Sequence, residues 1–261
     1  MTSRPDLERR AALPLYLTGE HECSYIAGLS ARTLFVDPLQ RVDSGTYQLL
    51  LERGFRRSGG HIYRPGCDRC HRCVSLRIPV RAFMPTRSQR RNREQNGRDL
   101  VLTSRPPAFE PEHYRLYYAY LQNRHPDGSM ADASPASYSD FLVTAWGGET
   151  RFLELRLEAR LVAVAVTDLL PGALSAVYTF FDPQLSHRAP GTYAILCQIE
   201  EARRLGLDYL YLGYWIEECR KMSYKDGYRP TEAWLDGSWR RFAKGETIPW
   251  RAQNDPAEKA S

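Results

Sequence analysis

The sequence predicts an α+β protein in which a small mixed N-terminal domain packs on a C-terminal mixed sheet flanked by helices. Three observations support this prediction. The second half of the chain alternates strongly patterned helices and strands. Residues 103–112 (TSRPPAFEPE) carry three prolines, which mark a domain edge. The 261 residues, 43% of them hydrophobic, suffice for two cores. We therefore expect domains at residues 1–104 and 105–245, followed by a flexible tail at 246–261.

The N-terminal part is expected to begin with two short strands, LPLYL at residues 13–17 and LFVDP at residues 34–38, where the proline ends the strand in a turn. SGTYQLLLERGF, residues 44–55, has a helical pattern of apolar positions. Ser44 can cap this helix and Gly54 can end it.

Two further elements precede the proline-rich edge. VSLRIPV, residues 74–80, alternates apolar with polar side chains, which predicts a strand with one buried face. SQRRNREQNGRD, residues 88–99, is expected to be a polar helix.

The C-terminal part has the clearest patterns. GTYAILCQIEEARRLG should be a helix, because Ile195, Ile199, Ala202 and Leu205 share a face. Glu200 and Arg204 are spaced for an i,i+4 ion pair. The expected order is helices at 112–125 and 134–146 joined by the loop HPDGSMADAS, strands at 151–158, 161–170 and 174–183, the helix at 191–206 and a strand at 207–215. This order resembles the acetyltransferase-like (GNAT-like) fold, in which acyl donors bind at a splayed pair of central strands.

Positive charge is concentrated in residues 53–98. This segment has thirteen arginines, no lysine and two acidic residues, a balance of +11, whereas the whole chain totals +5. Segregated arginine suits phosphate recognition, so the segment predicts RNA binding, and a solvated surface is the alternative. The expected tRNA contacts are Arg56, Arg57, Arg87, Arg90, Arg91 and Arg93.

Three cysteines, Cys67, Cys70 and Cys73, follow one another at strict two-residue spacing. Thiolates so arranged favour a structural zinc or an iron–sulfur centre. A fourth ligand is needed, and Cys23 is the first candidate, ahead of His71. The alternative is reduced thiols without metal. Six cysteines in a chain of this length fit a reducing compartment.

Two motifs in the C-terminal part contain residues suited to binding a substrate. Arg188-Ala-Pro-Gly191-Thr precedes the long helix, where free backbone N–H groups suit an anion, although an ordinary helix start is equally compatible. It partly matches the Arg/Gln-x-x-Gly-x-Gly/Ala pattern of acetyltransferases, with Tyr193 in place of the last small residue. The second motif interleaves aromatic and basic side chains, including Tyr211, Lys221, Tyr224 and Lys225. It suits stacking on a base and binding of a carboxylate, or a plain core edge with a basic loop.

Several of these blocks are specific to one family. CSYIAGLSARTLFVDP, GFRRSG, YRPGCDRCHRCVSLRIPV, FMPTRSQRR and GTYAILCQIEEARRLGLDYLYLGYWIEECRKMSYKDGYRP resemble the bacterial aspartate/glutamate leucyltransferases. These are relatives of the eukaryotic arginyl-tRNA–protein transferases. The similarity extends over nearly the whole chain, roughly residues 13–240.

The resemblance implies transfer of leucine from leucyl-tRNA to the N-terminal amine of proteins that begin with Asp or Glu, within N-degron protein degradation. It implies no cofactor for catalysis, and metal binding by Cys23 and the Cys67 cluster, as in the eukaryotic relatives. Arg188, Lys221 and Lys225 are the expected partners of the acceptor carboxylate, by motif position. Arg188, Gly191, Tyr211 and Tyr224 are the candidate catalytic residues, and no general base is identified.

Other functions stay open. The donor could be arginyl-tRNA with the same acceptors, and a non-catalytic RNA-binding zinc protein is a further alternative. An acetyl-coenzyme A enzyme is disfavoured by Tyr193 and the arginine segment. No apolar run approaches the roughly 20 residues of a membrane span, so we expect a cytoplasmic protein without membrane contact. The sequence does not indicate an oligomeric state.

Overall fold

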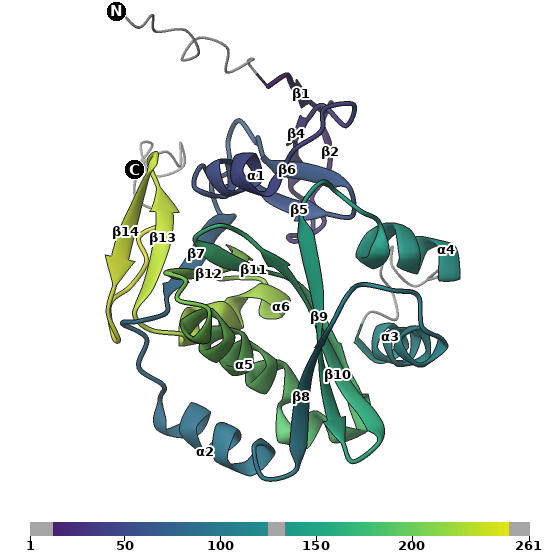
Figure 1. Ribbon diagram of the computed structural model, residues 1–261. Helices are drawn as coiled ribbons and strands as arrows, with labels where there is room; N and C mark the ends of the chain where they lie inside the picture. Colours follow the sequence, from purple (N-terminus) through teal and green to yellow (C-terminus); the bar gives the residue numbers. More distant parts are fainter. Residues whose placement is uncertain (1–12, 125–133, 251–261) are drawn as a thin grey trace, which may run out of the picture.

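An eight-stranded mixed sheet lies at the centre of the protein (Figure 1). The computed structural model describes residues 13–124 and 134–250. Neighbouring strands of the sheet run antiparallel except β11 and β12, which are parallel. In spatial order the strands are β14 (Ser238–Phe242), β13 (Thr231–Leu235), β7 (Val74–Pro79), β12 (Tyr209–Trp215), β11 (Ala173–Phe181), β10 (Arg160–Leu169), β9 (Glu149–Leu157) and β8 (Leu100–Arg105).

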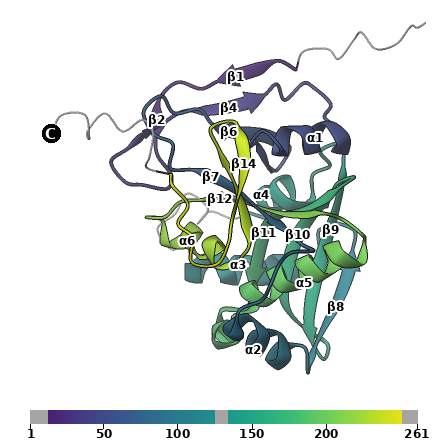
Figure 2. The ribbon, with the colours of Figure 1, turned by 90° about the vertical axis from the view of Figure 1, so that its left-hand side faces the viewer.

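A smaller sheet and helix α1 (Ser44–Leu51) lie over one end of the large sheet, at the top of Figures 1 and 2. A shared core, which includes Tyr47, Phe55 and Tyr211, joins the two parts. The small sheet has the order β1 (Leu15–Leu17), β4 (Thr33–Val36), β6 (His61–Pro65) and β5 (Arg56–Ser58), and β2 (His21–Glu22) pairs separately with β3 (Ser30–Ala31).

Helices cover both faces of the large sheet because side chains alternate along its strands. Phe152 of β9 packs with α3 (Pro111–Arg124), and its neighbour Leu153 packs with α5 (Pro190–Arg204). The other helical segments are α2 (Arg87–Asn96), α4 (Pro135–Tyr138), the π-helix η1 (Ser139–Val143), the 3-10 helix η2 (Pro183–Arg188), α6 (Arg220–Ser223) and the 3-10 helix η3 (Tyr224–Gly227). No helix in the described ranges is long and apolar enough to cross a membrane.

The strongest sequence patterns are confirmed. The apolar face predicted for residues 191–206 is buried in α5, where Ile195, Ile199 and Ala202 belong to one core cluster and Leu205 packs against it. The three antiparallel strands are β9, β10 and β11. The expected loop at 125–134 lies outside the described residues, apart from Ser134.

Local details differ from the predictions where a competing partner is available. Asp43, not Ser44, caps α1, because its carboxylate accepts from the backbone N–H of Thr46 at 2.7 Å. Arg204 pairs with Glu201 rather than with Glu200. Strand β7 is buried on both faces: Leu76 packs with Trp215 and Ile248, and Arg77 lies against the rings of Tyr209 and Trp239.

The change from one sheet to the other does not coincide with residue 104. Strands β7 and β8, within the expected N-terminal domain 1–104, both belong to the large sheet. The first part of the expected tail is also packed, since Ile248 is 2% exposed in a core with Val74. Residues 251–261 lie outside the described ranges.

Candidate active site

The parallel strands β11 and β12 separate along most of their length. Residues 173–175 pair with residues 209–211, whereas β11 continues to Phe181 and β12 to Trp215. We call the unpaired part, residues 176–181 of β11 and 212–215 of β12, the β11–β12 splay. Backbone groups that face across the splay are free of each other, so other groups can bind them.

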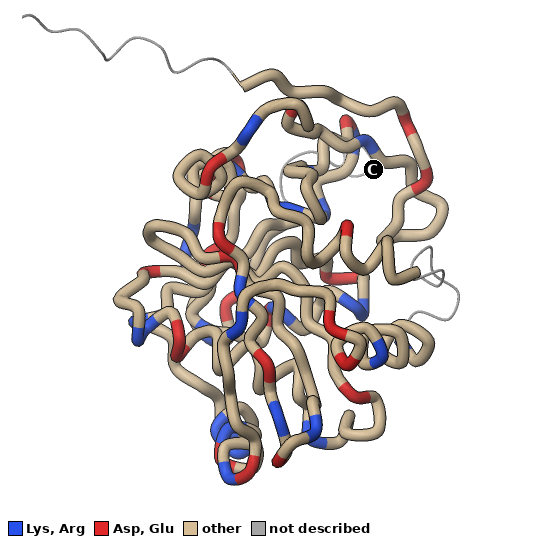
Figure 3. Tube along the Cα trace, turned by 45° about the vertical axis from the view of Figure 1, so that its right-hand side comes forward, with Lys and Arg blue, Asp and Glu red and all other residues tan. Residues whose placement is uncertain are grey.

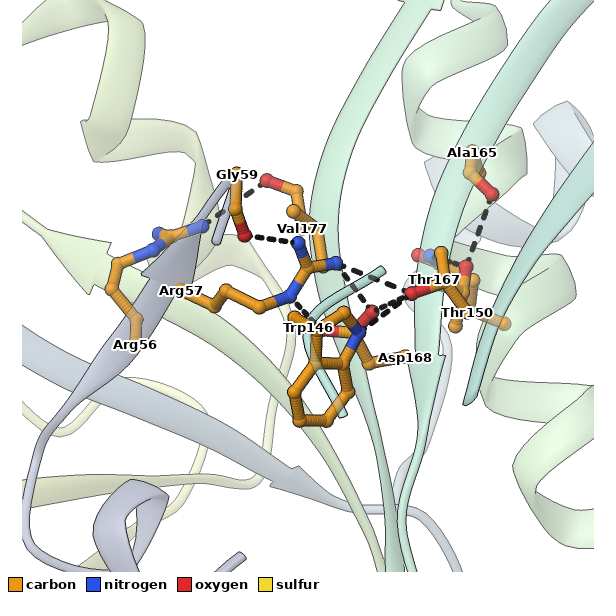
Figure 4. Close-up of polar contacts among 10 residues, drawn as sticks. Arg56, Arg57, Gly59, Trp146, Thr150, Ala165, Thr167, Asp168 and Val177 are labelled. Carbon is orange, nitrogen blue, oxygen red and sulfur yellow. Dashed lines mark hydrogen bonds and ion pairs between the residues drawn. The ribbon is translucent and has the colours of Figure 1, made fainter. Parts of the chain in front are cut away.

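Arg56 of strand β5 reaches into this splay. Its Nη2 donates a hydrogen bond to the carbonyl oxygen of Val177 at 3.1 Å (Figure 4). Val177 is the extra residue of a bulge between β10 and β11. On the β12 side, the guanidinium carbon lies 5.7 Å from the centre of the Tyr214 ring, a cation–π distance. One arginine therefore bridges the two separated strands.

Gly213 makes room for this arginine. Its φ of +74° is the left-handed region that side chains rarely adopt. A Cβ at this position would lie 1.8 Å from Arg56 Nη1 and 2.6 Å from its Cζ. The glycine is therefore needed both for the backbone turn and for the close approach of the guanidinium.

The next residue, Arg57, points the other way along β5 and is fully engaged (Figure 4). It forms a two-point ion pair with Asp168 at 2.9 and 2.6 Å, and it also donates to the Gly59 carbonyl at 2.6 Å. Trp146 stacks on the guanidinium at 5.1 Å. Arg57 is 2% exposed. The pair ties β5 to β10, and it removes Arg57 from the residues that a surface-bound tRNA can reach.

Lys225 lies next to the C-terminal end of β12. Its Nζ donates to the carbonyl of Tyr214 at 2.6 Å and approaches Met222 Sδ at 3.2 Å. Burial, followed by the positive charge of Arg56, lowers the pKa of Lys225 well below its ordinary value. The guanidinium of Arg56 stays protonated in proteins, so Arg56 is a permanent positive charge of this region.

Tyrosines surround the two basic groups. Tyr224 is 50% exposed. Partial burial raises its pKa to about 12, and the positive charge of Arg56 acts against this rise. The Tyr178 hydroxyl, on β11, is buried and has no hydrogen-bond partner among the described residues. The arrangement offers an anion or a carbonyl oxygen the Arg56 cation, with the phenol of Tyr224 nearby.

A second positively charged feature lies on α2, at the bottom of Figure 1, where Lys and Arg positions gather in Figure 3. Thr86 caps this helix with a capping box. Gln89 and Asn96 lie on its buried side. Asn96 donates a hydrogen bond to the carbonyl oxygen of Arg188 at 3.0 Å, which fixes the helix against the protein. The exposed side carries Arg87, Arg90, Arg91 and Arg93.

Comparison with known proteins places this fold in a family. Two family models match, described as the N terminus of arginine-tRNA-protein transferase, over residues 21–91, and its C terminus, over residues 112–235. The chain is 52% identical over 237 residues to the aspartate/glutamate leucyltransferase of Alkalilimnicola ehrlichii, which covers 90% of this chain and 98% of the relative. The chain belongs to the aspartate/glutamate leucyltransferase family. The corresponding protein of Pseudomonas fluorescens is 51% identical, over 88% of this chain and 97% of its own.

Solved structures resemble this leucyltransferase family member more distantly. L-PGS from Bacillus licheniformis has a TM-score of 0.43 and 14% identity, over 68% of this chain and 62% of its own. The C-terminal domain of a lysylphosphatidylglycerol synthetase from Agrobacterium fabrum has a TM-score of 0.42 and 13% identity, over 55% and 47%.

Other site residues predicted from the sequence have structural partners. The Arg188 guanidinium pairs with Asp99 and donates to Asn96 at 3.0 Å, which fastens α2 to η2. Tyr211 accepts from Arg77 at 3.1 Å in the core. Gly191 packs on Phe181, whose ring would lie 3.3 Å from an added Cβ. The structure thus gives Arg188 and Tyr211 partners within the protein, Asp99 and Arg77.

The cysteines gather where the N-terminal part meets α6. Burial raises the pKa of the Cys73 thiol to about 12, and the nearby thiols of Cys70, Cys23, Cys67 and Cys219 raise it further. The sulfur set suits zinc or an iron–sulfur centre. Within residues 13–124 and 134–250, no three His, Cys, Asp or Glu side chains are grouped closely enough to hold a metal ion. The metal centre stays a prediction.

A cavity of about 370 Å³ borders these thiols. Its walls include three arginines, two tryptophans and Tyr214, namely Arg53, Arg64, Arg240, Trp234 and Trp250 in addition to that tyrosine. Sequence patterns indicated neither the hairpin β13–β14 that supplies part of this wall nor Cys219 as a neighbour of the cluster. The segment WLDGSW, residues 234–239, contains the Asp-Gly turn Asp236-Gly237, which is the sequence signal for such a hairpin.

Proposed function

We propose that this protein transfers leucine from leucyl-tRNA to the N-terminal amine of proteins that begin with Asp or Glu, which marks them for degradation through the N-degron pathway. Identity of about half of the residues with aspartate/glutamate leucyltransferases, over nearly the full length of both chains, carries the proposal. The permanent cation in the β11–β12 splay supports it, because the acceptors are anionic.

The chemistry needs positioning more than activation. The acceptor nitrogen attacks the ester carbonyl carbon of leucyl-tRNA, a C–N bond forms, and the C–O bond to the ribose breaks with the tRNA hydroxyl as leaving group. The amine loses one proton, and the ribose oxygen that leaves gains one to become the hydroxyl. An N-terminal amine has an ordinary pKa of about 7.7–8.0, so a useful fraction is already neutral near pH 7. Most of the acceleration then comes from holding the amine and the ester in position and from hydrogen-bond donors to the developing oxyanion.

The donor tRNA is best accommodated along α2. The four arginines on its exposed side present planar forks for phosphate oxygens, and the buried side of the helix fixes their direction. We assign tRNA contacts to Arg87, Arg90, Arg91 and Arg93, and we omit Arg57, whose guanidinium is buried against Asp168.

The large sheet supports an acetyltransferase-like (GNAT-like) organisation. In that arrangement the acyl donor binds where two central parallel strands separate, and β11 and β12 are the parallel pair that separates here. The leucyl ester would then lie at the splay, beside Tyr178 and Tyr224. Catalysis itself needs no cofactor on this proposal.

Arginine as the transferred residue is the second candidate, since the matching family models are described as arginine-tRNA-protein transferases. One assay separates the two. The protein is incubated with labelled leucyl-tRNA or arginyl-tRNA and with peptides that begin with Asp, Glu, Lys or Ala. Label should pass from leucyl-tRNA to the Asp and Glu peptides. Transfer from arginyl-tRNA alone, or to the Lys peptide, would replace the proposed donor or acceptor, and absence of any transfer would favour an RNA-binding protein.

A further inference from the structure

We propose that Arg56, in the β11–β12 splay, binds the side-chain carboxylate of the acceptor's N-terminal Asp or Glu and so sets acceptor specificity. The assignment rests on the proposed leucyltransferase function and names a residue for its acceptor site. It differs from the positions that the sequence motifs indicated, since Arg188 is held by Asp99 and the Lys225 amine by a backbone carbonyl.

The first argument is the missing counter-ion. The other deeply set arginines of this chain have carboxylates: Arg57 pairs with Asp168, Arg77 with Glu232, and Arg229 with Asp226. Among the described residues Arg56 has no ion pair, and its one hydrogen bond goes to a backbone carbonyl. The titratable groups that act most strongly on Arg56 are the phenols of Tyr63, Tyr25 and Tyr214, and no carboxylate is among them.

A partly buried guanidinium with donors to spare is stabilised when an anion binds it. Arg56 keeps part of its surface accessible, so such an anion can reach it. Gly213 keeps a side chain out of the space beside Nη1. The fold therefore maintains a charged, partly accessible fork at the place where the sheet strands separate.

The surroundings favour a carboxylate over a tRNA phosphate. Arg56 lies among tyrosine rings and against the β12 backbone. A nucleic-acid backbone, by contrast, is bound by several exposed arginines in a row, such as those on α2. A planar carboxylate on a short side chain matches one guanidinium in two-point geometry. Asp and Glu end in this group, and the amine that reacts lies two or three carbons away from it.

The test uses two peptides that differ in charge but hardly in shape, one beginning with Asp and one with Asn. Leucine transfer by the wild-type protein to the Asp peptide tests the proposed function first. Arg56→Gln should then lower kcat/KM for the Asp peptide about 10- to 100-fold, the range of a lost charge-assisted hydrogen bond. The value for the Asn peptide should stay within about twofold, because glutamine fills the space without charge.

Two further variants control for structure. Arg204→Gln removes an exposed arginine that is paired with Glu201 on α5, and it should leave both kcat/KM values unchanged. Arg56→Lys keeps the charge and should retain part of the preference for Asp. Equal losses for the two peptides in Arg56→Gln would mean a packing role only. A raised KM for leucyl-tRNA with an unchanged peptide preference would assign Arg56 to the RNA instead.

A binding measurement separates this proposal from the proposed function. Fluorescence anisotropy of labelled Asp and Asn peptides, without tRNA, should show a preference for Asp that Arg56→Gln removes. If the wild-type protein transfers no leucine yet shows this preference, the proposed function fails and the carboxylate site stands. If transfer proceeds but Arg56→Gln keeps the full preference for Asp, the assignment of Arg56 is overturned.

Discussion

Gly213→Ala tests the central contact of the site, the approach of Arg56 to the β12 backbone. The added Cβ would lie 1.8 Å from Arg56 Nη1, so the guanidinium has to leave its place. Two costs follow. Alanine at a φ of +74° costs about 1–2 kcal/mol, and loss of the hydrogen bond to Val177 costs about 1 kcal/mol more. We expect the free energy of unfolding to fall by about 2–3 kcal/mol.

Gly206 provides a matched control. Its φ is +72° and no heavy atom lies within 4 Å of an added Cβ, so Gly206→Ala should cost only the backbone part, about 1–2 kcal/mol. Urea unfolding followed by tryptophan fluorescence measures both variants. Transfer of leucine to an Asp peptide should fall in Gly213→Ala and stay unchanged in Gly206→Ala, because only the first displaces Arg56.

A double variant completes the test. In an Arg56→Ala background the guanidinium is absent, so Gly213→Ala should then cost about as much as Gly206→Ala, and the two substitutions should be non-additive by about 1 kcal/mol. Equal costs for Gly213→Ala and Gly206→Ala in the wild-type background, with full activity in both, would refute the contact.

Four further predictions follow from other parts of the structure. Asp168→Ala leaves the buried guanidinium of Arg57 without its carboxylate, so urea titrations should show a free energy of unfolding lower by about 3–5 kcal/mol. A loss below about 1 kcal/mol would contradict the buried ion pair. Replacing Arg90 and Arg91 together with Ala should raise the KM for leucyl-tRNA and flatten its salt dependence, and unaltered tRNA kinetics would make α2 only a solvated surface. Lys225 has a lowered pKa in the folded protein, so the unfolded chain binds the extra proton; stability should therefore rise with pH up to about 10.4 relative to Lys225→Met, and parallel pH profiles would contradict this. The predicted metal centre requires zinc or iron in the purified protein, lost in Cys70→Ser, and metal analysis that finds neither removes it.

Sequence patterns predicted burial correctly where an element has one apolar face and packs with it against the core. The periodic apolar positions of α5 predicted the face that the structure buries. The patterns failed for β7, whose Ser75 and Arg77 were expected on a solvated face. These side chains are buried. Arg77 pairs with Glu232 of β13 and lies against the rings of Tyr209 and Trp239. A partner that lies 155 residues away along the chain leaves no local signal.

The family and its chemistry could be read from the sequence, because long blocks of residues and the concentration of arginine in residues 53–98 are properties of the chain itself. The roles of single arginines could not. Arg56 and Arg57 are neighbours of the same type, and strand alternation sends one to the splay and the other to Asp168. Only the tertiary structure decides which arginine is neutralised, because the carboxylate and the strand separation that distinguish them come from β10, β11 and β12, more than a hundred residues further along the chain.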